Sequence, residues 1–254
     1  MKSRPRKIVL AAAQSNSLAG GIDSNVRTHT KFVQAAIEFD CDLILFPELS
    51  LTGYEKELAG ELAMTPDDVR LSPLREQAQR SAITIVAGAP IAHADGKPYV
   101  GAIVFYSDRS FVYTKQHLHH SEDEFFSAGD CAGVVDLNGE FAGLAICADI
   151  ANPAHADEAA ALGASIYAAS VFVTPEGYPA DAALLRQYAA QHQMAVILSN
   201  FAGPTGGLSS AGKSALWDET GHLVVAAPES GEYLVVAERT DAGWNGRVHE
   251  LPLS

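Results

Sequence analysis

Three reactive side chains stand where predicted buried strands end: Glu48, Lys115 and Cys147. Residues 141–146 form an apolar run that leads directly into the cysteine. Because α/β sheets place their ligands at the carboxyl ends of strands, we expect the three side chains to meet. A thiol needs a base to become a thiolate, and the carboxylate can supply it. The ammonium would stabilise the thiolate. It would also stabilise the oxyanion that forms when the thiolate attacks a carbon–oxygen or carbon–nitrogen double bond.

Each of these residues also has an ordinary structural interpretation. Most unpaired cysteines are small core hydrophobes. Glu48 could cap a helix or a turn, and Lys115 could be the solvated end of a hairpin. Burying a lysine without a partner would cost folding free energy, because its charge would lose contact with water. The coincidence of three such groups at the same kind of position favours a site over three unrelated structural roles.

The elements that must position these residues are those of an α/β protein. Apolar runs predict buried strands, amphipathic spacing predicts helices, and turn residues such as Asn138-Gly139 predict hairpins. Each half of the chain mixes strand–helix–strand units with hairpin strands. We therefore expect two sheets packed face to face with helices outside, a four-layer αββα sandwich.

The predicted strands span residues 8–13, 42–46, 83–87, 99–106, 111–114, 134–137, 141–146, 164–173, 195–199, 213–217, 222–226 and 233–237. The predicted helices span residues 23–39 (capped by Asp23 or Ser24), 55–64, 73–80, 154–162 and 181–193.

The composition is that of an ordinary globular protein. The chain has 254 residues, 48% hydrophobic and 19% charged, and no linker divides it, so we expect a single domain over residues 1–254. The net charge of -14 disfavours nucleic acid and anionic membrane surfaces as partners. The three cysteines, Cys41, Cys131 and Cys147, are too sparse for a disulfide framework, which indicates a reducing compartment.

The N-terminal segment has a basic start followed by the apolar run 8–13. This run is shorter than the roughly seven to fifteen apolar residues of a signal peptide. No apolar run approaches the roughly 20 residues that a membrane span needs. We therefore expect a flexible basic tail over residues 1–7, a first strand after it, and a cytoplasmic protein.

Three blocks of sequence make the pattern specific. They are Phe46-Pro-Glu48-Leu-Ser-Leu-Thr-Gly-Tyr54, Tyr113-Thr-Lys115-Gln-His-Leu118 and Gly143-Leu-Ala-Ile-Cys147-Ala-Asp149. In order and spacing they resemble the signature blocks of the nitrilase superfamily of carbon–nitrogen hydrolases, and the strand pattern agrees over residues 8–236. The resemblance implies the αββα sandwich of that superfamily. It also implies a triad with Glu48 as general base, Lys115 as oxyanion stabiliser and Cys147 as nucleophile, and no metal or organic cofactor.

The resemblance also points to a second catalytic glutamate, seven residues before a glycine in the loop after the lysine. Counting from Gly129 selects Glu122, with Asp123 and Glu124 as close rivals. Core packing explains the aromatic residues near these blocks as well as a pocket does. The candidate substrate-binding residues are Tyr54, His117, Ala148 and Phe172.

The sequence around Cys147 departs from the family pattern. Ala148 stands where the family often has a bulky aromatic, and no arginine follows within a few residues to hold a substrate carboxylate. True nitrilases commonly have Cys-Trp-Glu here, so Cys147-Ala-Asp149 favours amide over nitrile hydrolysis. The predicted function is hydrolysis of a small amide through a thioester. An N-carbamoyl amidohydrolase, a nitrilase, an acyltransferase and a non-catalytic ligand-binding protein stay open as alternatives.

A polar loop raises the further alternative of a metal site. His117, His119 and His120 lie close in sequence to Glu122 and Glu124. However, histidines in a polar loop are more often solvated, and no second cluster of ligands balances them. We therefore expect no metal.

The resemblance also implies an assembly. It predicts a homodimer built through the helix after Cys147 and the one after Asp181. The expected partners are thus a small-molecule amide substrate and a second copy of the chain, with no nucleic acid and no membrane.

Overall fold

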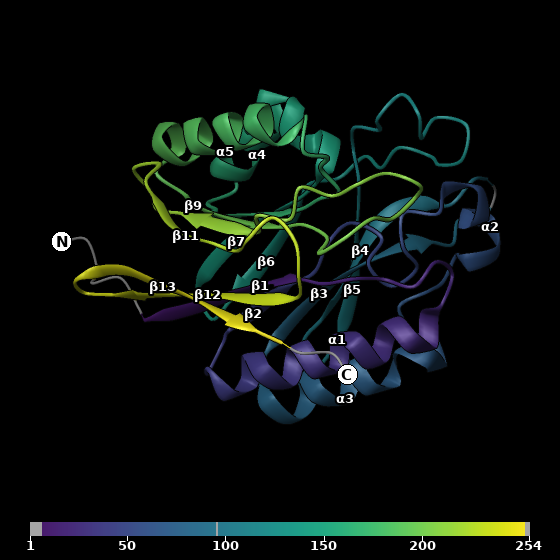
Figure 1. The fold of residues 1–254 in the computed structure, drawn as a ribbon, viewed down its shortest axis with the longest axis horizontal. Coiled ribbons are helices and arrows are strands. Elements are labelled where there is room, and N and C mark those ends of the chain that lie inside the picture. Colours follow the sequence, from purple (N-terminus) through teal and green to yellow (C-terminus); the bar gives the residue numbers. More distant parts are fainter. Residues whose placement is uncertain (1–6, 95, 252–254) are drawn as a thin grey trace.

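The computed structural model describes residues 7–94 and 96–251, in which the strands form two mixed sheets that lie face to face (Figure 1). The 7-stranded sheet has the spatial order β13 (Gly243–Glu250), β12 (Tyr233–Thr240), β1 (Ile8–Gln14), β2 (Leu43–Leu45), β3 (Thr84–Ile91), β4 (Tyr99–Phe105) and β5 (Ser110–Thr114). The 6-stranded sheet has the order β11 (Leu223–Ala226), β10 (Ala215–Trp217), β9 (Ala195–Ser199), β8 (Ile166–Ser170), β7 (Glu140–Ile146) and β6 (Gly133–Leu137).

Helices cover the outer face of each sheet (Figure 1). Two of them, α1 (Ile22–Glu38) and α3 (Ser72–Ser81), lie on the 7-stranded sheet, and α4 (Pro153–Ala161) and α5 (Tyr178–His192) lie on the 6-stranded sheet. This arrangement confirms the predicted four-layer αββα sandwich. The shorter helical segments are η1 (Lys56–Leu58), α2 (Ala59–Leu62), η2 (Val69–Leu71) and η3 (Cys147–Ala151).

The central strands are buried on both faces, because each sheet has helices on one side and the other sheet on the opposite side. Successive side chains of a strand point to opposite faces. In β1, Leu10 and Ala12 therefore pack between the sheets, while Val9 and Ala11 pack against the helical layer. The neighbours β1, β2 and β3 are parallel, and so are β7, β8 and β9. Strands buried in this way are nearly continuous apolar runs, which is why the sequence predicted them.

Two segments differ from the predicted elements because their sequence signals are weak. β12 continues to Thr240 and turns into β13, a strand that was not predicted. Most β13 side chains are exposed, so no apolar alternation marks this edge strand. The predicted helix over residues 55–64 is shorter in the structure, where η1 and the one-turn α2 follow each other directly.

Two helix starts also differ from the prediction. α5 begins at Tyr178 rather than at residue 181, because Pro179 fits the first turn of a helix, where no backbone donor is needed. α1 begins after Gly21, with no side-chain cap, so both predicted caps, Asp23 and Ser24, were wrong. These shifts stay within one turn and leave the layers unchanged.

The remaining sequence expectations concern the termini, the membrane and the cysteines. Within residues 7–94 and 96–251, no helix combines the length and apolarity needed to cross a membrane. Cys41, Cys131 and Cys147 are free thiols, as expected from their number. The predicted basic tail lies outside the described residues except for Lys7, whose Nζ is 3.0 Å from Glu238 Oε1.

A close backbone approach connects β3 to the segment that follows β2. The carbonyl of Gly88 accepts a hydrogen bond of 2.9 Å from the Leu51 amide. A Cβ atom at Gly88 would lie 2.5 Å from the Pro47 carbonyl oxygen and closer still to the Leu49 nitrogen. Both neighbours are backbone atoms, so a side chain here would push the Glu48 segment away from β3.

We expect Gly88→Ala to lower the free energy of unfolding by about 1–3 kcal/mol, the usual effect of overpacking a well-packed interior. Urea unfolding followed by circular dichroism measures this change. The matched control is Gly60→Ala in α2, where a Cβ would meet nothing within 4 Å. Equal stabilities for the two variants would contradict the close approach.

Candidate active site

The ends of three strands bring the predicted reactive residues together. Glu48 follows β2, Lys115 follows β5, and Cys147 follows β7 on the opposing sheet. The Lys115 Nζ donates a hydrogen bond of 2.7 Å to Glu48 Oε1, and both side chains are fully buried. The two residues are 67 positions apart in the chain, so this contact depends on the packing of the sheet.

Glu122 is the second carboxylate on the same ammonium. Lys115 Nζ lies 2.9 Å from Glu122 Oε1 and 2.8 Å from Oε2. The Tyr54 hydroxyl donates to Glu122 Oε1 at 2.6 Å, and the His119 amide donates to Oε2 at 2.8 Å. The structure therefore places Glu122 at this site. Its predicted rivals, Asp123 and Glu124, are exposed.

Both carboxylates hold Lys115 in its charged form. Burial alone would lower the pKa of the Lys115 ammonium, because charge is poorly solvated in the interior. The negative charges of Glu48 and Glu122, and that of Cys147 when it is a thiolate, outweigh burial, and the pKa is raised above its ordinary value. The protein thus keeps a permanent cation in a position closed to water.

For the pKa of Glu48, the effect of burial outweighs the effect of the neighbouring lysine. Burial raises the pKa of its carboxyl to about 7, assisted by the charge of Glu122 and opposed by Lys115. Among the described residues, Glu48 Oε2 has no hydrogen-bond partner of standard geometry. The Cys147 thiol is nevertheless near enough for its hydrogen bonding to lower the Glu48 pKa slightly. Glu48 therefore has one oxygen on the lysine and one left to exchange a proton with the cysteine.

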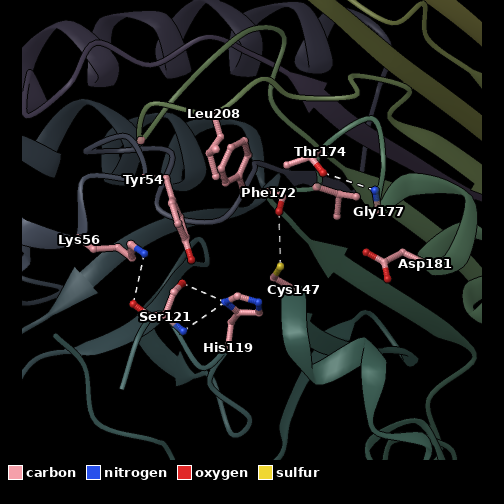
Figure 2. Close-up of a pocket in the computed structure, with 12 residues that line it drawn as sticks. Tyr54, Lys56, His119, Ser121, Cys147, Phe172, Thr174, Gly177, Asp181 and Leu208 are labelled. Carbon is pink, nitrogen blue, oxygen red and sulfur yellow. Dashed lines mark hydrogen bonds between the residues drawn. The ribbon is translucent and has the colours of Figure 1, made fainter. Parts of the chain in front are cut away.

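Cys147 sits on a strained turn between β7 and η3. Its φ of 44° lies in the left-handed region, which a non-glycine residue adopts only where the surroundings enforce it. The Cys147 Sγ lies 3.6 Å from the carbonyl oxygen of Phe172 (Figure 2). Burial, and then the charge of Glu48, raises the pKa of the thiol well above its ordinary value, although Lys115 opposes them. The resting group is therefore the thiol, which needs a base to react.

A cavity of about 260 Å³ opens beside Cys147 (Figure 2). Of the predicted substrate-binding residues, Tyr54 and Phe172 line it, with their ring centroids 5.0 Å apart. The lining residues are Tyr54, Lys56, His119, Ser121, Cys147, Phe172, Val173, Thr174, Gly177, Asp181, Gly206 and Leu208.

The structure does not bring His117 and Ala148 to the wall of this cavity. The His117 Nδ1 is 3.2 Å from Asp149 Oδ1, and its Nε2 is 2.6 Å from Asn152 Nδ2. Ala148 is the second residue of η3 and is half-buried. His117 is therefore part of a neighbouring polar network.

Asp149 is the centre of that network, and the sequence did not single out its role. Oδ1 accepts hydrogen bonds from the amides of Gln116 (3.1 Å) and His117 (2.9 Å). Oδ2 accepts from the Tyr113 hydroxyl (2.7 Å) and the Ile146 amide (2.9 Å). One buried carboxyl thus joins the chain just after Lys115 to the chain just before Cys147. The acid in the third sequence block was the available signal.

The predicted alternative of a metal site gains no support from this geometry. His119 approaches Glu122 through its backbone amide, whereas its ring Nδ1 lies 2.9 Å from Ser121 Oγ. Across residues 7–94 and 96–251, no group of three or more His, Cys, Asp or Glu side chains is arranged to hold a metal ion.

Sequence comparison identifies the family. The family model described as carbon-nitrogen hydrolase matches residues 9–244. A relative named "Hydrolase in pqqF 5'region" from Pseudomonas protegens is 32% identical over 202 residues, covering 76% of this chain and 70% of its own. A nitrilase from Pyrococcus abyssi is 29% identical, covering 91% of this chain and 89% of its own.

Solved structures of the superfamily have the same fold. Nit3 of Saccharomyces cerevisiae, a member of branch 10 of the nitrilase superfamily, matches with a TM-score of 0.85 at 24% identity, covering 92% of this chain and 90% of its own. A variant of the amidase from Nesterenkonia sp. AN1 in complex with butyramide matches with a TM-score of 0.83 at 21% identity, covering 91% and 90%.

The chain belongs to the carbon-nitrogen hydrolase family of the nitrilase superfamily, because the family match spans nearly the whole sequence. This confirms the resemblance of the three sequence blocks and the sandwich fold that it implied.

Asp149→Asn tests whether the Asp149 network holds the site together. Three of the groups around the Asp149 oxygens are backbone amides, which can only donate, so an amide NH₂ at either position would face at least one donor left without an acceptor. We expect the free energy of unfolding to fall by about 1–3 kcal/mol, the penalty of an unsatisfied buried polar group. Chemical denaturation measures it, and Asp123→Asn on the exposed loop is the control. A variant as stable as that control would refute the proposed role.

Proposed function

We propose that this carbon-nitrogen hydrolase cleaves small linear amides through a thioester on Cys147. The observation that carries the proposal is the contact of Glu48 and Glu122 with Lys115 beside a thiol that opens onto a cavity. The short Ala148 beside the cysteine supports an amide over a nitrile as substrate. Butyramide in the similar amidase from Nesterenkonia sp. AN1 fits the same size class.

The first half of the reaction forms the thioester. Glu48 takes the proton of the Cys147 thiol, and the sulfur attacks the amide carbon, whose carbonyl bond opens to an oxyanion. Lys115 and the Ala148 amide stabilise that oxyanion. Glu48 returns the proton to the leaving nitrogen, the carbon–nitrogen bond breaks, and ammonia or an amine departs.

The second half restores the enzyme. Glu48 takes a proton from water, the resulting hydroxide attacks the thioester carbon, and the sulfur leaves as a thiolate that recovers the proton from Glu48. Glu122, held by Tyr54 and Lys115, orients the amide nitrogen and then the water. No step needs a metal or an organic cofactor.

The alternatives use the same residues and differ in the substrate. An N-carbamoyl amidohydrolase or a nitrilase would start with the same thiol attack, and the Pyrococcus abyssi relative is named a nitrilase. An acyltransferase would replace water by an amine or alcohol. A non-catalytic binding protein would not need Glu48, Lys115 and Cys147 to be retained together. The cavity of about 260 Å³ favours a small acyl group in every case.

The homodimer and the cytoplasmic location stay predictions. The helices through which the dimer would form, α4 and α5, make up one outer layer (Figure 1). Their exposed positions include small residues, Ala154, Ala161, Ala183 and Ala190, which would permit close approach of a second copy.

Ammonia release from butyramide, butyronitrile and N-carbamoylglycine tests the proposal. We expect butyramide to be the best of the three, and Cys147→Ala to reduce release to the buffer background because the nucleophile is absent. Cys131→Ala, which removes an exposed free thiol, should release ammonia like the wild type. Release that survives in Cys147→Ala would overturn the mechanism, and a preference for the nitrile would replace amidase by nitrilase.

The pH dependence should report the Glu48 carboxyl. Since its pKa is raised to about 7, it is ionised above that pH and protonated, hence unable to act as a base, below it. We expect kcat/KM for butyramide to fall about tenfold per pH unit below about pH 7 and to level off above it. Initial rates in overlapping buffers measure the profile, with circular dichroism as the control for folding. A profile that stays flat down to about pH 5 would show that Glu48 is not the base.

A further inference from the structure

The turn that carries Glu48 has a strained backbone. Leu49, the next residue, has a φ of 52°, which lies in the left-handed region that a leucine side chain disfavours. The same segment lies directly on β3 through the close backbone approach at Gly88. A backbone of this kind persists only where its surroundings enforce it. One buried side chain from another layer of the sandwich contacts this segment on both sides of Glu48.

That side chain is His29 of α1, the helix on the outer face of the 7-stranded sheet (Figure 1). Its ring is fully buried and stacks on Phe46, with the ring centroids 3.9 Å apart. Its Nε2 lies 2.9 Å from the Ser50 Oγ. Phe46 stands two residues before Glu48, and Ser50 stands two residues after it. From these contacts we infer that His29 is a positioning residue that holds the Glu48 carboxylate within reach of Cys147, which rests on the proposed role of Glu48 as the base.

The hydrogen bonds around His29 have one consistent set of directions. Its Nδ1 lies 2.7 Å from the carbonyl oxygen of Asn25, which can only accept, so Nδ1 carries a proton. Burial lowers the pKa of His29 to about 4, so the ring is neutral at pH 7 and Nε2 has no proton. Nε2 therefore accepts from the Ser50 hydroxyl. The oxygen of that hydroxyl accepts from the Gly88 amide at 3.3 Å, so Ser50 joins His29 to β3.

Ser50 fixes the end of the turn that contains Glu48. Its amide donates to the Pro47 carbonyl oxygen at 3.2 Å, and its carbonyl oxygen accepts from the Ser17 hydroxyl at 2.6 Å. Glu48 lies between Pro47 and Ser50, so a displacement of Ser50 displaces the Glu48 backbone. The carboxylate would then leave the position from which one oxygen reaches Lys115 and the other reaches the thiol. A misplacement of about 1 Å in a catalytic group can cost about a hundredfold in rate.

His29→Phe keeps a ring that can stack on Phe46 but removes the acceptor of the Ser50 hydroxyl. We expect kcat for butyramide at pH 8 to fall about tenfold or more with KM within about twofold, because a misplaced base slows the chemical step and leaves the cavity intact. The acid limb of kcat/KM should move up by about half a pH unit or more, because a carboxyl farther from Lys115 is protonated more easily. His29→Gln, whose amide oxygen can replace Nε2 as the acceptor, should restore most of kcat.

Val33→Ala is the matched control for a loss of stability alone. Val33 is one turn further along α1, fully buried and apolar. It should lower the urea midpoint, as His29→Phe does, and keep the kcat and the acid limb of the wild type. A His29→Phe variant that behaves like Val33→Ala in kcat and pH profile would overturn the inference.

Ser50→Ala removes the same hydrogen bond from the other partner. The double variant of His29→Phe and Ser50→Ala should lose no more kcat than the more affected single variant, because residues that act through one contact are not additive. Additive losses would show that His29 acts independently of the turn and would overturn the inference. If His29→Phe does not fold, Ser50→Ala decides the question, since an unchanged kcat and acid limb there would also overturn it.

Alkylation by iodoacetamide separates this inference from the proposed function. The Cys147 sulfur displaces iodide and Glu48 takes the thiol proton, so the step needs the base but no amide hydrolysis. Cys131→Ala as the background removes the exposed thiol, and the buried Cys41 has a pKa raised to about 12. Mass spectrometry measures the rate at pH 8.

We expect His29→Phe to slow the alkylation about tenfold or more and Val33→Ala to leave it unchanged. If the wild type hydrolyses no amide, the proposed function fails, and slower alkylation in His29→Phe still supports the positioning role. Equal alkylation rates in the wild type and in His29→Phe would exclude that role whether or not the amides are hydrolysed.

Discussion

The buried Lys115 ammonium is the constraint on which the whole site depends. An unpaired cation in a protein interior is very costly, so Lys115 has a carboxylate on either side, Glu48 at 2.7 Å and Glu122 at 2.8 Å. Two anions for one cation leave negative charge in excess, and burial with that excess raises the pKa of Glu48 to about 7. The interactions that keep the lysine charged therefore also leave a carboxylate able to gain and lose a proton near neutral pH.

Two contacts maintain this arrangement, one at the backbone of Gly88 and one through the side chain of Asp149. Gly88 lets the Glu48 segment lie directly on β3, and Asp149 joins the chain after Lys115 to the turn that carries Cys147. The left-handed backbone of Cys147 is held by these neighbours rather than by its own preference. The reactive groups thus come from both sheets but sit on strand ends whose positions are set by a fully buried core.

Sequence reasoning located the central residues and missed their surroundings. Glu48, Lys115 and Cys147 were recognisable because each stands at or shortly after the end of a strand. Counting from Gly129 selected Glu122, which lies beside the lysine, whereas Asp123 and Glu124 are exposed. Lys56 and Asp181 were not singled out, since an exposed charge and a cavity-facing charge have the same local pattern. β13 was missed for a similar reason: an edge strand with mostly exposed side chains has no apolar periodicity.

The sequence by itself determined the layers, because strands covered on both faces must be apolar throughout and the order of strands and helices then allows few arrangements. It also determined which reactive residues stand at strand ends. Only the tertiary structure decided which side chains touch, because those contacts join distant segments: Tyr54 meets Glu122 across 68 positions, and Lys115 meets Glu48 across 67. The charges that surround the cavity, and the pKa of Glu48, follow from that packing and have no local signal in the chain.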